Sequence, residues 1–409
     1  MNASSIFNNF LDYYTYMERY VNDGSPSGFT QIHNTSFNTN PYTGLSSFHL
    51  LEFDDDDCET IIRGEENSLF SIGVNYSHPD SLKSSILLKA KRKQKESSIL
   101  VTPTASSRTM LILNEKIRGF LKLTYDVSKI GRCTRDISCL SALASLETSQ
   151  RFKECIDDGI LPSTLAVLLE TSCKVSKLVL QEDSFEWGTI FRRFEPYPNN
   201  DNQLLIVPAF SLFSTDKKNP EEEKLINQFI ELSGQSPEEY LWNVIKITVD
   251  AHWNLVIKAA LRPEMHAQNC MYELDRNYKL SRIIIKDMED IDRDLFVAKF
   301  TNNDYNWNTY PYKCYDENSR DFMYQASYMY DFKLGEYLLS PIIKCVSNKF
   351  GLDEKIFERK IKDYVRSKYL PRLPFNYFSN ESSWYYCKNV DRRPGESKKF
   401  FSKENPKFR

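Results

Sequence analysis

The chain has 409 residues, a length that allows a large buried core and two or three subdomains. Its 53 Lys and Arg residues nearly balance 56 Asp and Glu residues, and the formal net charge is -3, so no strong overall field recruits nucleic acid or an anionic membrane. The nine cysteines are scattered without CxxC pairs, and the first residues lack the basic and apolar regions of a signal peptide. These features predict a cytoplasmic protein with reduced thiols and with neither a nucleic-acid nor a membrane partner.

The first half of the chain is predicted to be rich in β-strands. A weakly amphipathic stretch at 10–21 predicts a short helix, and turn-forming residues end it. Apolar and β-branched runs predict strands, and periodic Leu, Ala and Ile positions predict two helices further on. The strands are expected at 69–76, 98–102, 111–114, 119–125, 188–192 and 204–208, and the helices at 139–159 and 163–173.

The second half is predicted to be mainly helical. Pro220 opens a helix that runs to about residue 232, and a capping box at 236–239 has Pro237 at the first helical position of the next helix. That second helix carries His252 on its apolar side, where a packed histidine is expected and not a ligand. Long helical patterns follow at 321–348 and at 353–368, the latter with Asp353 as its N-cap.

A polar run lies between the helix that begins at Pro237 and a predicted hairpin of residues 271–275 and 279–286. Asp287 follows the second strand, so the hairpin returns it toward the run. Hard oxygen ligands from Glu264, Asn269 and Asp287 would suit Mg²⁺, which prefers a few protein oxygens together with substrate phosphates. Spacing alone leaves open the alternative that these are ordinary polar loop residues. The run contributes Glu264, His266, Gln268 and Asn269.

A second polar motif lies at the bend between two predicted strands, at residues 104–110. Its hydroxyls and its one arginine can present several donors to a phosphate, and the guanidinium of Arg108 offers two-pronged geometry. An ordinary polar turn is the alternative. Arg192, at the end of the strand predicted at 188–192, is a second-rank site candidate, and a surface arginine is its alternative.

Together these motifs resemble the IucA/IucC family of siderophore synthetases. These ligases are independent of nonribosomal peptide synthetases and use ATP to join citrate or a similar acid to an amine or alcohol. The run LRPEMHAQN at 261–269, the hairpin and IIIKD at 283–287 look like the family's Glu-x-His-x-Gln-Asn run, hairpin and Arg-Asp pair. Residues 106–110 resemble the family's Ser-x-Arg-Thr phosphate turn, and FLKL at 120–123 resembles the Lys-Leu strand after it. The resemblance covers roughly residues 31–409.

The chain departs from the family pattern at the first nucleotide-binding motif. The large N-terminal domain that usually precedes this motif is almost absent. The chain keeps His33, Asn34, Gly44 and Leu45, but Ser36, Asn40 and Tyr42 replace the family's second His, its Lys and its Arg. These departures leave open a catalytically degenerate homologue that binds a nucleotide or a protein partner without turnover.

The resemblance implies an α+β fold shaped like a cupped hand. A short N-terminal extension at 1–32 would replace most of the thumb, and β-rich fingers at 33–218 would bind the nucleotide. A mainly helical palm at 219–409 would carry the Mg²⁺ and substrate site. The implied cofactors are ATP and Mg²⁺, and the implied substrates are a citrate-like carboxylic acid and an amine or alcohol.

The resemblance also implies a role for individual residues. The acid would be oriented by His266, Lys388 and Arg135, with Arg132 as a close competitor of Arg135. Mg²⁺ would be bound by Glu264, Asn269 and Asp287. ATP would be contacted by His33, Ser106, Ser107, Arg108, Thr109, Met110, Lys122 and Gln268. The identity of the acid and of the nucleophile, and whether the protein forms a homodimer, do not follow from the sequence.

Overall fold

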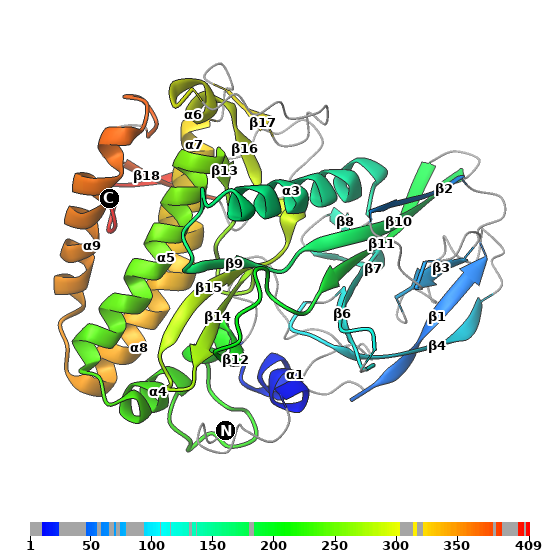
Figure 1. Cartoon of the computed structure of the whole chain (residues 1–409), viewed down its shortest axis with the longest axis horizontal. Helices are drawn as coiled ribbons and strands as arrows, with labels where there is room; N and C mark the ends of the chain where they lie inside the picture. The colour runs from blue at the N-terminus through cyan, green and yellow to red at the C-terminus, as the bar shows by residue number, and fades with distance from the viewer. Residues whose placement is uncertain are drawn as a thin grey trace.

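The structure is a computed structural model of the chain. It describes residues 10–23, 46–54, 59–64, 69–70, 74–78, 94–106, 108–114, 116–130, 133–135, 137–179, 184–302, 314–316, 322–378, 382–386, 400–404 and 406–409. Strands of a large sheet lie at one end of the molecule and long helices at the other, with a smaller sheet between them (Figure 1). The α+β class predicted from the sequence is confirmed.

The helix expected at 10–21 is present as α1 (Phe10–Tyr20). Its buried apolar residues, Tyr14, Met17 and Val21 just after its end, recur at helical spacing. The helix packs against strand β12 (Gln203–Pro208) of the smaller sheet, far along the chain. α1 therefore joins the folded body and does not project from it.

The large sheet has eight strands in the order β2-β10-β11-β6-β5-β4-β1-β3, and all neighbours in it are antiparallel. Most of the strands expected in the first half of the chain belong to this sheet. Its strands are β1 (Phe48–Asp54), β2 (Glu59–Gly64), β3 (Val74–Ser77), β4 (Gln94–Pro103), β5 (Thr109–Ile112), β6 (Gly119–Leu123), β10 (Glu170–Val179) and β11 (Ser184–Arg193).

Strands β5 and β6 are buried on both faces, so successive side chains enter two different cores. Met110 and Leu121 are paired across the strands and pack in a cluster on one face. Leu111 and Phe120 are paired in the same way and pack on the opposite face, against side chains of the smaller sheet. Alternation along these two strands thus connects the large sheet to the rest of the molecule.

The helix expected at 139–159 is α3 (Cys139–Asp157), and Ser138 caps it by accepting a hydrogen bond from the Ser141 amide at 3.1 Å. The prediction of a helix at 163–173 is wrong. Residues there form β9 (Leu165–Val167) and the start of β10. The run Leu165–Leu169 is buried throughout, because β9 lies parallel to β15 (Leu280–Ile285) inside the smaller sheet. A short, fully apolar run has no periodicity that separates a buried strand from a helix.

The smaller sheet has four strands in the order β12-β14-β15-β9. The predicted hairpin is confirmed as β14 (Cys270–Asp275) paired with β15, and Tyr278 in its turn has a positive φ of 60°. Strands β9 and β12 come from before residue 218, and the hairpin comes from after it. The proposed division of the chain into regions at residues 32 and 218 remains a prediction.

The helical end of the molecule is built around α5 (Pro237–Ala259). The predicted capping box is confirmed, because Ser236 accepts a hydrogen bond from the Glu239 amide at 3.2 Å and Pro237 opens the helix. Asp353 caps α9 (Glu354–Lys368) as expected. The helix expected from Pro220 begins later, as α4 (Leu225–Ser233). The pattern at 321–348 forms α7 (Phe322–Ser327), the π-helix η6 (Tyr328–Leu339) and α8 (Ser340–Phe350).

Short elements complete the described part of the chain, and none of its helices is both long and apolar enough to cross a membrane. These elements are β7 (Tyr125–Ile130), β8 (Cys133–Arg135), η4 (Ala209–Leu212), β13 (Leu261–Arg262), η5 (Met288–Asp290), β16 (Asp292–Asp294), α6 (Leu295–Phe300), β17 (Cys314–Tyr315), η7 (Leu370–Arg372), β18 (Ser382–Tyr386) and β19 (Phe400–Glu404).

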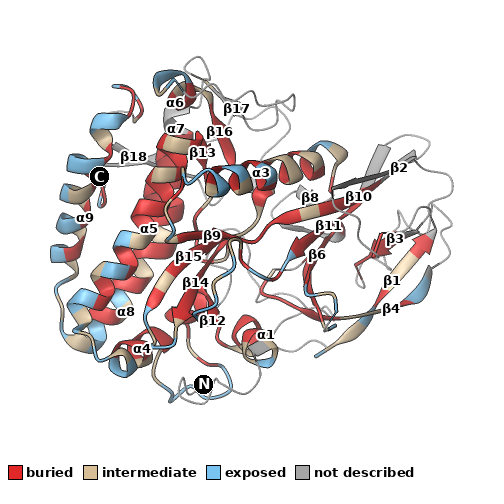
Figure 2. Cartoon of the chain, in the orientation of Figure 1, coloured by how far each residue is buried: buried red, intermediate tan, exposed pale blue. Residues whose placement is uncertain are grey.

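Buried residues occur at the helical end, in the smaller sheet and in the large sheet (Figure 2), and the largest core cluster joins the helical end to the smaller sheet. One cluster connects the two sheets, and we call it the apolar joint. It comprises Tyr14, Leu111, Phe120, Ala166, Leu168, Phe194, Ile206, Met271 and Ile284. Because the joint takes residues from α1 and from both sheets, it fixes the strand ends that carry the charged groups described next.

Candidate functional site

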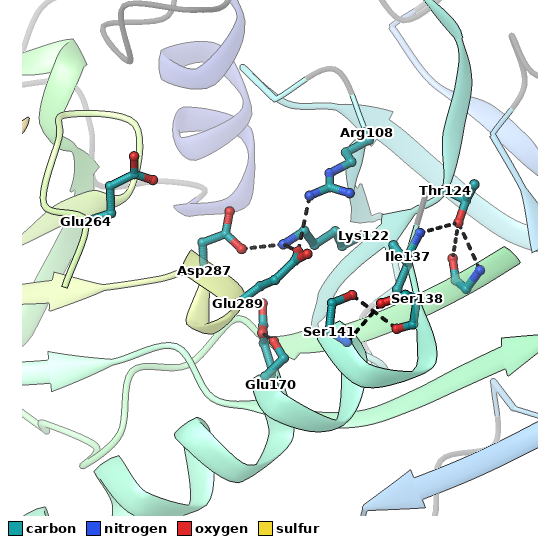
Figure 3. A network of polar contacts seen from close by, with 12 residues as sticks. Arg108, Lys122, Thr124, Ile137, Ser138, Ser141, Glu170, Glu264, Asp287 and Glu289 are labelled. Carbon is teal, nitrogen blue, oxygen red and sulfur yellow. Dashed lines mark hydrogen bonds and ion pairs between the residues drawn. The ribbon is translucent and has the colours of Figure 1, made fainter. Parts of the chain in front are cut away.

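Six charged side chains form one cluster where the two sheets meet, and we call it the charged network. Figure 3 shows Arg108, Lys122, Glu170, Asp287 and Glu289 of this cluster. Lys122 contacts both Asp287 and Glu289, the latter at 2.7 Å between Nζ and Oε2. Arg108 Nη2 lies 3.2 Å from Glu289 Oε2. Arg192 lies 3.3 Å from Asp287 Oδ1, and its Nε donates to Glu170 Oε1 at 3.0 Å. The network comprises Arg108, Lys122, Glu170, Arg192, Asp287 and Glu289.

Strand geometry explains why these groups meet. Phe120 and Lys122 lie two residues apart in β6, so both side chains leave the same face of the strand. Phe120 packs in the apolar joint, and Lys122 therefore reaches toward the smaller sheet. Phe120 is also paired with Arg192 in β11. Asp287 and Glu289 follow β15, which brings them to the face from which Lys122 and Arg192 project.

Lys122 and Arg192 remain charged although they are buried. Burial alone would lower the pKa of Lys122, but the carboxylates of Asp287 and Glu289 outweigh it and raise that pKa above its ordinary value. Burial likewise opposes the charge of Arg192, and Glu170 and Asp287 raise its pKa. Buried ion pairs therefore stand at the point where the two sheets meet.

Glu170 is the most deeply buried member of the network. Its side chain accepts a hydrogen bond from the Ser145 hydroxyl of α3, and its backbone amide donates to Ser149 Oγ at 2.9 Å. It contacts Arg192 through both Nε and Nη2. Helix α3 thus holds the carboxylate that orients Arg192.

The described residues of the predicted phosphate turn form hydrogen bonds with one another and with α1. The Thr104 hydroxyl donates to the Thr109 carbonyl at 2.8 Å and accepts from the Ser106 amide at 3.2 Å. The Ala105 amide donates at 2.9 Å to Oε2 of Glu18, a buried residue of α1. Ser106 is partly exposed, whereas the Met110 side chain belongs to the core of the large sheet. The turn therefore presents Arg108 from a bend that α1 supports.

The polar run before the hairpin is also ordered. His266 Nδ1 accepts a hydrogen bond from the Gln268 amide at 3.2 Å, which places the proton of a neutral imidazole on Nε2. That Nε2 lies 3.6 Å from Glu264 Oε2. The Lys286 amide donates to the Asn269 carbonyl at 3.0 Å, so the run lies beside the end of the hairpin that carries Asp287.

The three predicted Mg²⁺ ligands supply the hard oxygen atoms that this ion prefers. In the structure, the carboxylate of Glu264 is held by Lys333 of η6 at 2.6 Å, and the carboxylate of Asp287 is held by Lys122. No three His, Cys, Asp or Glu side chains gather as metal ligands within the described ranges. Asp287 has a left-handed backbone with a φ of 72°, a conformation that is uncommon outside glycine and that gathers at functional sites. The donor atoms suit Mg²⁺ by their chemistry.

Several predicted residues have no described side chain. His33, Ser36, Asn40, Tyr42, Ser107, Arg132 and Lys388 lie outside the described residues, and only the backbone of Arg135 is described, in β8. His252 is confirmed as a packed residue. It is buried against Tyr330, and burial, together with the charge of Arg262, lowers its pKa to about 3.

Sequence reasoning missed four charged residues of this region. These residues contact predicted site residues or the turns that carry them, but they belong to no motif or lie far along the chain from the residues they contact. They are Glu18, Glu170, Glu289 and Lys333. The surface alternative for Arg192 is wrong, since this residue is buried. A buried charge needs a partner of opposite sign. The position of Arg192 at the end of an apolar strand was therefore the one signal in the sequence that a carboxylate lies nearby.

No family model matches the chain, and no curated protein matches it by sequence. Solved structures do match. Petrobactin biosynthesis protein AsbB from Bacillus anthracis str. Sterne aligns with a TM-score of 0.67 at 14% identity, over 88% of this chain and 68% of that one. ATP-bound aerobactin synthetase IucA from a hypervirulent pathotype of Klebsiella pneumoniae aligns with a TM-score of 0.64 at 13% identity, over 90% of this chain and 70% of that one. Aerobactin synthetase IucC from the same source gives 0.60 at 15%, over 83% and 66%.

The matches extend over most of this chain and over about two thirds of each solved one. Few residues are identical, between 13% and 15% in these three alignments. The chain has the fold of the siderophore synthetases, as its resemblance to the IucA/IucC family implied.

Proposed function

We propose that the chain is an ATP-dependent ligase of siderophore biosynthesis, and so of iron acquisition. It would adenylate a carboxylate of citrate or a related acid and condense the product with an amine or alcohol. The charged network is the observation that carries this proposal, because it places two predicted phosphate-binding cations, Arg108 and Lys122, beside a predicted metal ligand, Asp287. The fold shared with an ATP-bound aerobactin synthetase supports it.

The proposed reaction has two steps. A carboxylate oxygen of the acid attacks the α-phosphorus of ATP, and the bond to the departing pyrophosphate breaks. The amine or hydroxyl then attacks the acyl carbon and AMP leaves. Such chemistry needs neutralisation of phosphate charge and orientation of two anions more than it needs a protein nucleophile. Arg108, Lys122 and the hydroxyls of the turn would serve the phosphates, whereas His266, Arg135 and Lys388 would orient the acid.

Mg²⁺ belongs to the same proposal. Glu264, Asn269 and Asp287 would hold it, and it would supply positive charge to the phosphate chain. His266, whose Nε2 faces Glu264, would stay oriented by the Gln268 amide. The three-region organisation and the cytoplasmic location expected from the sequence are likewise parts of this proposal.

A second candidate function is a degenerate homologue that binds a nucleotide or a protein partner without turnover. One observation favours it: the two predicted phosphate-binding cations already contact carboxylates of this chain. The ligase is preferred because Arg108, Lys122 and Asp287 come from three separate elements and still meet in one network.

The deciding experiment measures pyrophosphate release by the purified chain with ATP, Mg²⁺ and citrate, with hydroxylamine as a generic nucleophile. We expect release that depends on citrate. Arg108→Ala and Asp287→Asn should each lower the rate by about 100-fold or more, the usual cost of losing one preorganised electrostatic group.

Lys349→Ala is the matched control, since Lys349 pairs with Glu223 on the surface. It should leave the rate unchanged. Wild-type rates in both Arg108→Ala and Asp287→Asn would refute the site. A wild-type chain that binds ATP but releases no pyrophosphate with citrate or related acids would favour the degenerate homologue.

A further inference from the structure

Glu289 has a central place in the charged network. A single oxygen, Oε2, accepts from Arg108 Nη2 at 3.2 Å and from Lys122 Nζ at 2.7 Å. The side chains of Arg108 and Lys122 are only 9% and 2% exposed, and that of Glu289 is 11% exposed. Here one anionic oxygen accepts hydrogen bonds from a buried guanidinium and a buried ammonium. A phosphate oxygen would bind to the same two groups in the same way.

The charges of the network are balanced. Arg108, Lys122 and Arg192 contribute three positive charges, and Glu170, Asp287 and Glu289 contribute three negative charges. A polyphosphate chain that approached Arg108 and Lys122 would meet the like charges of Asp287 and Glu289 at short range. Repulsion between such charges is strong where the surroundings exclude water.

The position of Glu289 allows its carboxylate to leave. The residue lies in η5, a short 3₁₀ turn that follows the left-handed residue Asp287. Its neighbour Met288 is buried in the main core and anchors the turn. Rotation of the Glu289 side chain would therefore remove one carboxylate from Arg108 and Lys122 without breaking a strand of either sheet, and Lys122 would keep its contact with Asp287.

We propose that Glu289 competes with the phosphate chain for Arg108 and Lys122, and that it thereby favours metal-bound over metal-free polyphosphate. A bound divalent cation reduces the negative charge of the polyphosphate, and so weakens its repulsion by the carboxylates of Glu289 and Asp287. A metal-free polyphosphate keeps its full charge and has to displace Glu289 against the full repulsion. This inference rests on the proposed nucleotide function and adds to it a residue that sets which form of the ligand binds.

The test is calorimetric titration of the full chain with inorganic tripolyphosphate, once with EDTA and once with excess Mg²⁺. Glu289→Gln keeps the size of the side chain and one acceptor oxygen but removes its charge. Without metal, Glu289→Gln should bind tripolyphosphate about tenfold more tightly than the wild type, or more, the scale of one displaced charge-assisted contact. Mg²⁺ should improve the affinity of the wild type more than that of the variant.

Glu223→Gln is the matched control, because it removes a carboxylate that pairs with Lys349 on the surface. It should bind like the wild type. Equal metal-free affinities of the wild type and Glu289→Gln, or weaker binding by the variant, would overturn the inference. If Glu289→Gln does not fold, Glu289→Asp serves instead. It withdraws the carboxylate by one methylene, and metal-free affinity no higher than that of the wild type would overturn the inference equally.

The two proposals fail in different ways. Pyrophosphate release reports adenylation, and tripolyphosphate titration reports competition for the two cations. If the chain adenylates citrate but Glu289→Gln does not raise the metal-free affinity for tripolyphosphate, the ligase is supported and this inference is refuted. If Glu289→Gln raises that affinity but the chain shows no adenylation, the competition is supported and the ligase is refuted.

Discussion

Glu18 of α1 is a buried carboxylate that connects three separate parts of the chain. Its Oε1 accepts from the Tyr14 hydroxyl at 2.6 Å and lies 3.4 Å from Lys286 Nζ, and its Oε2 accepts from the Ala105 amide at 2.9 Å. Ala105 belongs to the predicted phosphate turn, and Lys286 precedes Asp287. Burial, followed by the charge of Glu18, raises the pKa of Tyr14 well above its ordinary value, so the phenol stays a donor. Glu18 therefore positions both sides of the charged network.

Glu18→Ala should destabilise the chain by about 3 kcal/mol, since it leaves a buried amide, a hydroxyl and an ammonium without this acceptor. Glu18→Gln keeps an acceptor for the Ala105 amide and should cost less. Tyr14→Phe removes one hydrogen bond and should cost about 1 kcal/mol. Urea unfolding of the three variants measures these differences. A Glu18→Ala chain as stable as the wild type would contradict the role.

Single residues show where prediction of the site from sequence stops. Arg108, Lys122 and Asp287 were predicted because each stands in a short motif, and the structure brings them together. Glu289 stands in a polar run without a motif, and its partners lie 181 and 167 residues away. Such contacts depend on which faces of two sheets meet, which local spacing does not encode.

At the scale of elements, Glu223 ties the start of α4 to α8. It pairs with Lys349 of α8 and accepts a hydrogen bond from the Asn227 amide group at 2.9 Å. Partial burial favours the neutral acid, but the hydrogen bonds from Lys349, Asn227 and the Lys224 amide lower the pKa of Glu223 to about 2. The folded state thus binds its proton less readily than the unfolded chain does.

The dependence of stability on pH follows from the lowered pKa of Glu223. The contribution of Glu223 to stability is fully present above about pH 4.5, the ordinary pKa of the residue, and is lost as the pH falls toward 2. The pair is partly exposed, so its contribution should stay below about 1 kcal/mol. Urea unfolding between pH 6 and pH 3 should show that Glu223→Gln loses less stability than the wild type. Equal losses would show that Glu223 does not carry this dependence.

Local chemistry specifies some elements completely and others not at all. The starts of α5 and α9 follow from Ser236, Pro237 and Asp353, whose capping roles depend only on neighbours. The hairpin of β14 and β15 follows from its β-forming runs. The strand β9 was predicted as a helix because its conformation is set by pairing with β15, more than 100 residues away.

At the scale of the whole molecule, the apolar joint and the charged network lie side by side at the meeting of the two sheets. Phe120 and Lys122 leave the same face of β6, and one packs in the joint while the other enters the network. Ile284 of β15 packs in the joint, and Asp287, two residues after the end of that strand, enters the network. Packing of the joint therefore sets the distance between the cations of the large sheet and the carboxylates of the smaller one.

Two Phe→Leu substitutions separate this effect from general stability. Phe120 lies in the joint, and Phe53 packs on Trp187 within the large sheet. Both rings are buried, so each substitution should cost on the order of 1–3 kcal/mol in urea unfolding. Only Phe120→Leu should also weaken binding of tripolyphosphate with Mg²⁺, by about tenfold, because misplacement by a fraction of an ångström is felt by charge-assisted contacts. Equal binding by the two variants would mean that the network keeps its geometry without the joint.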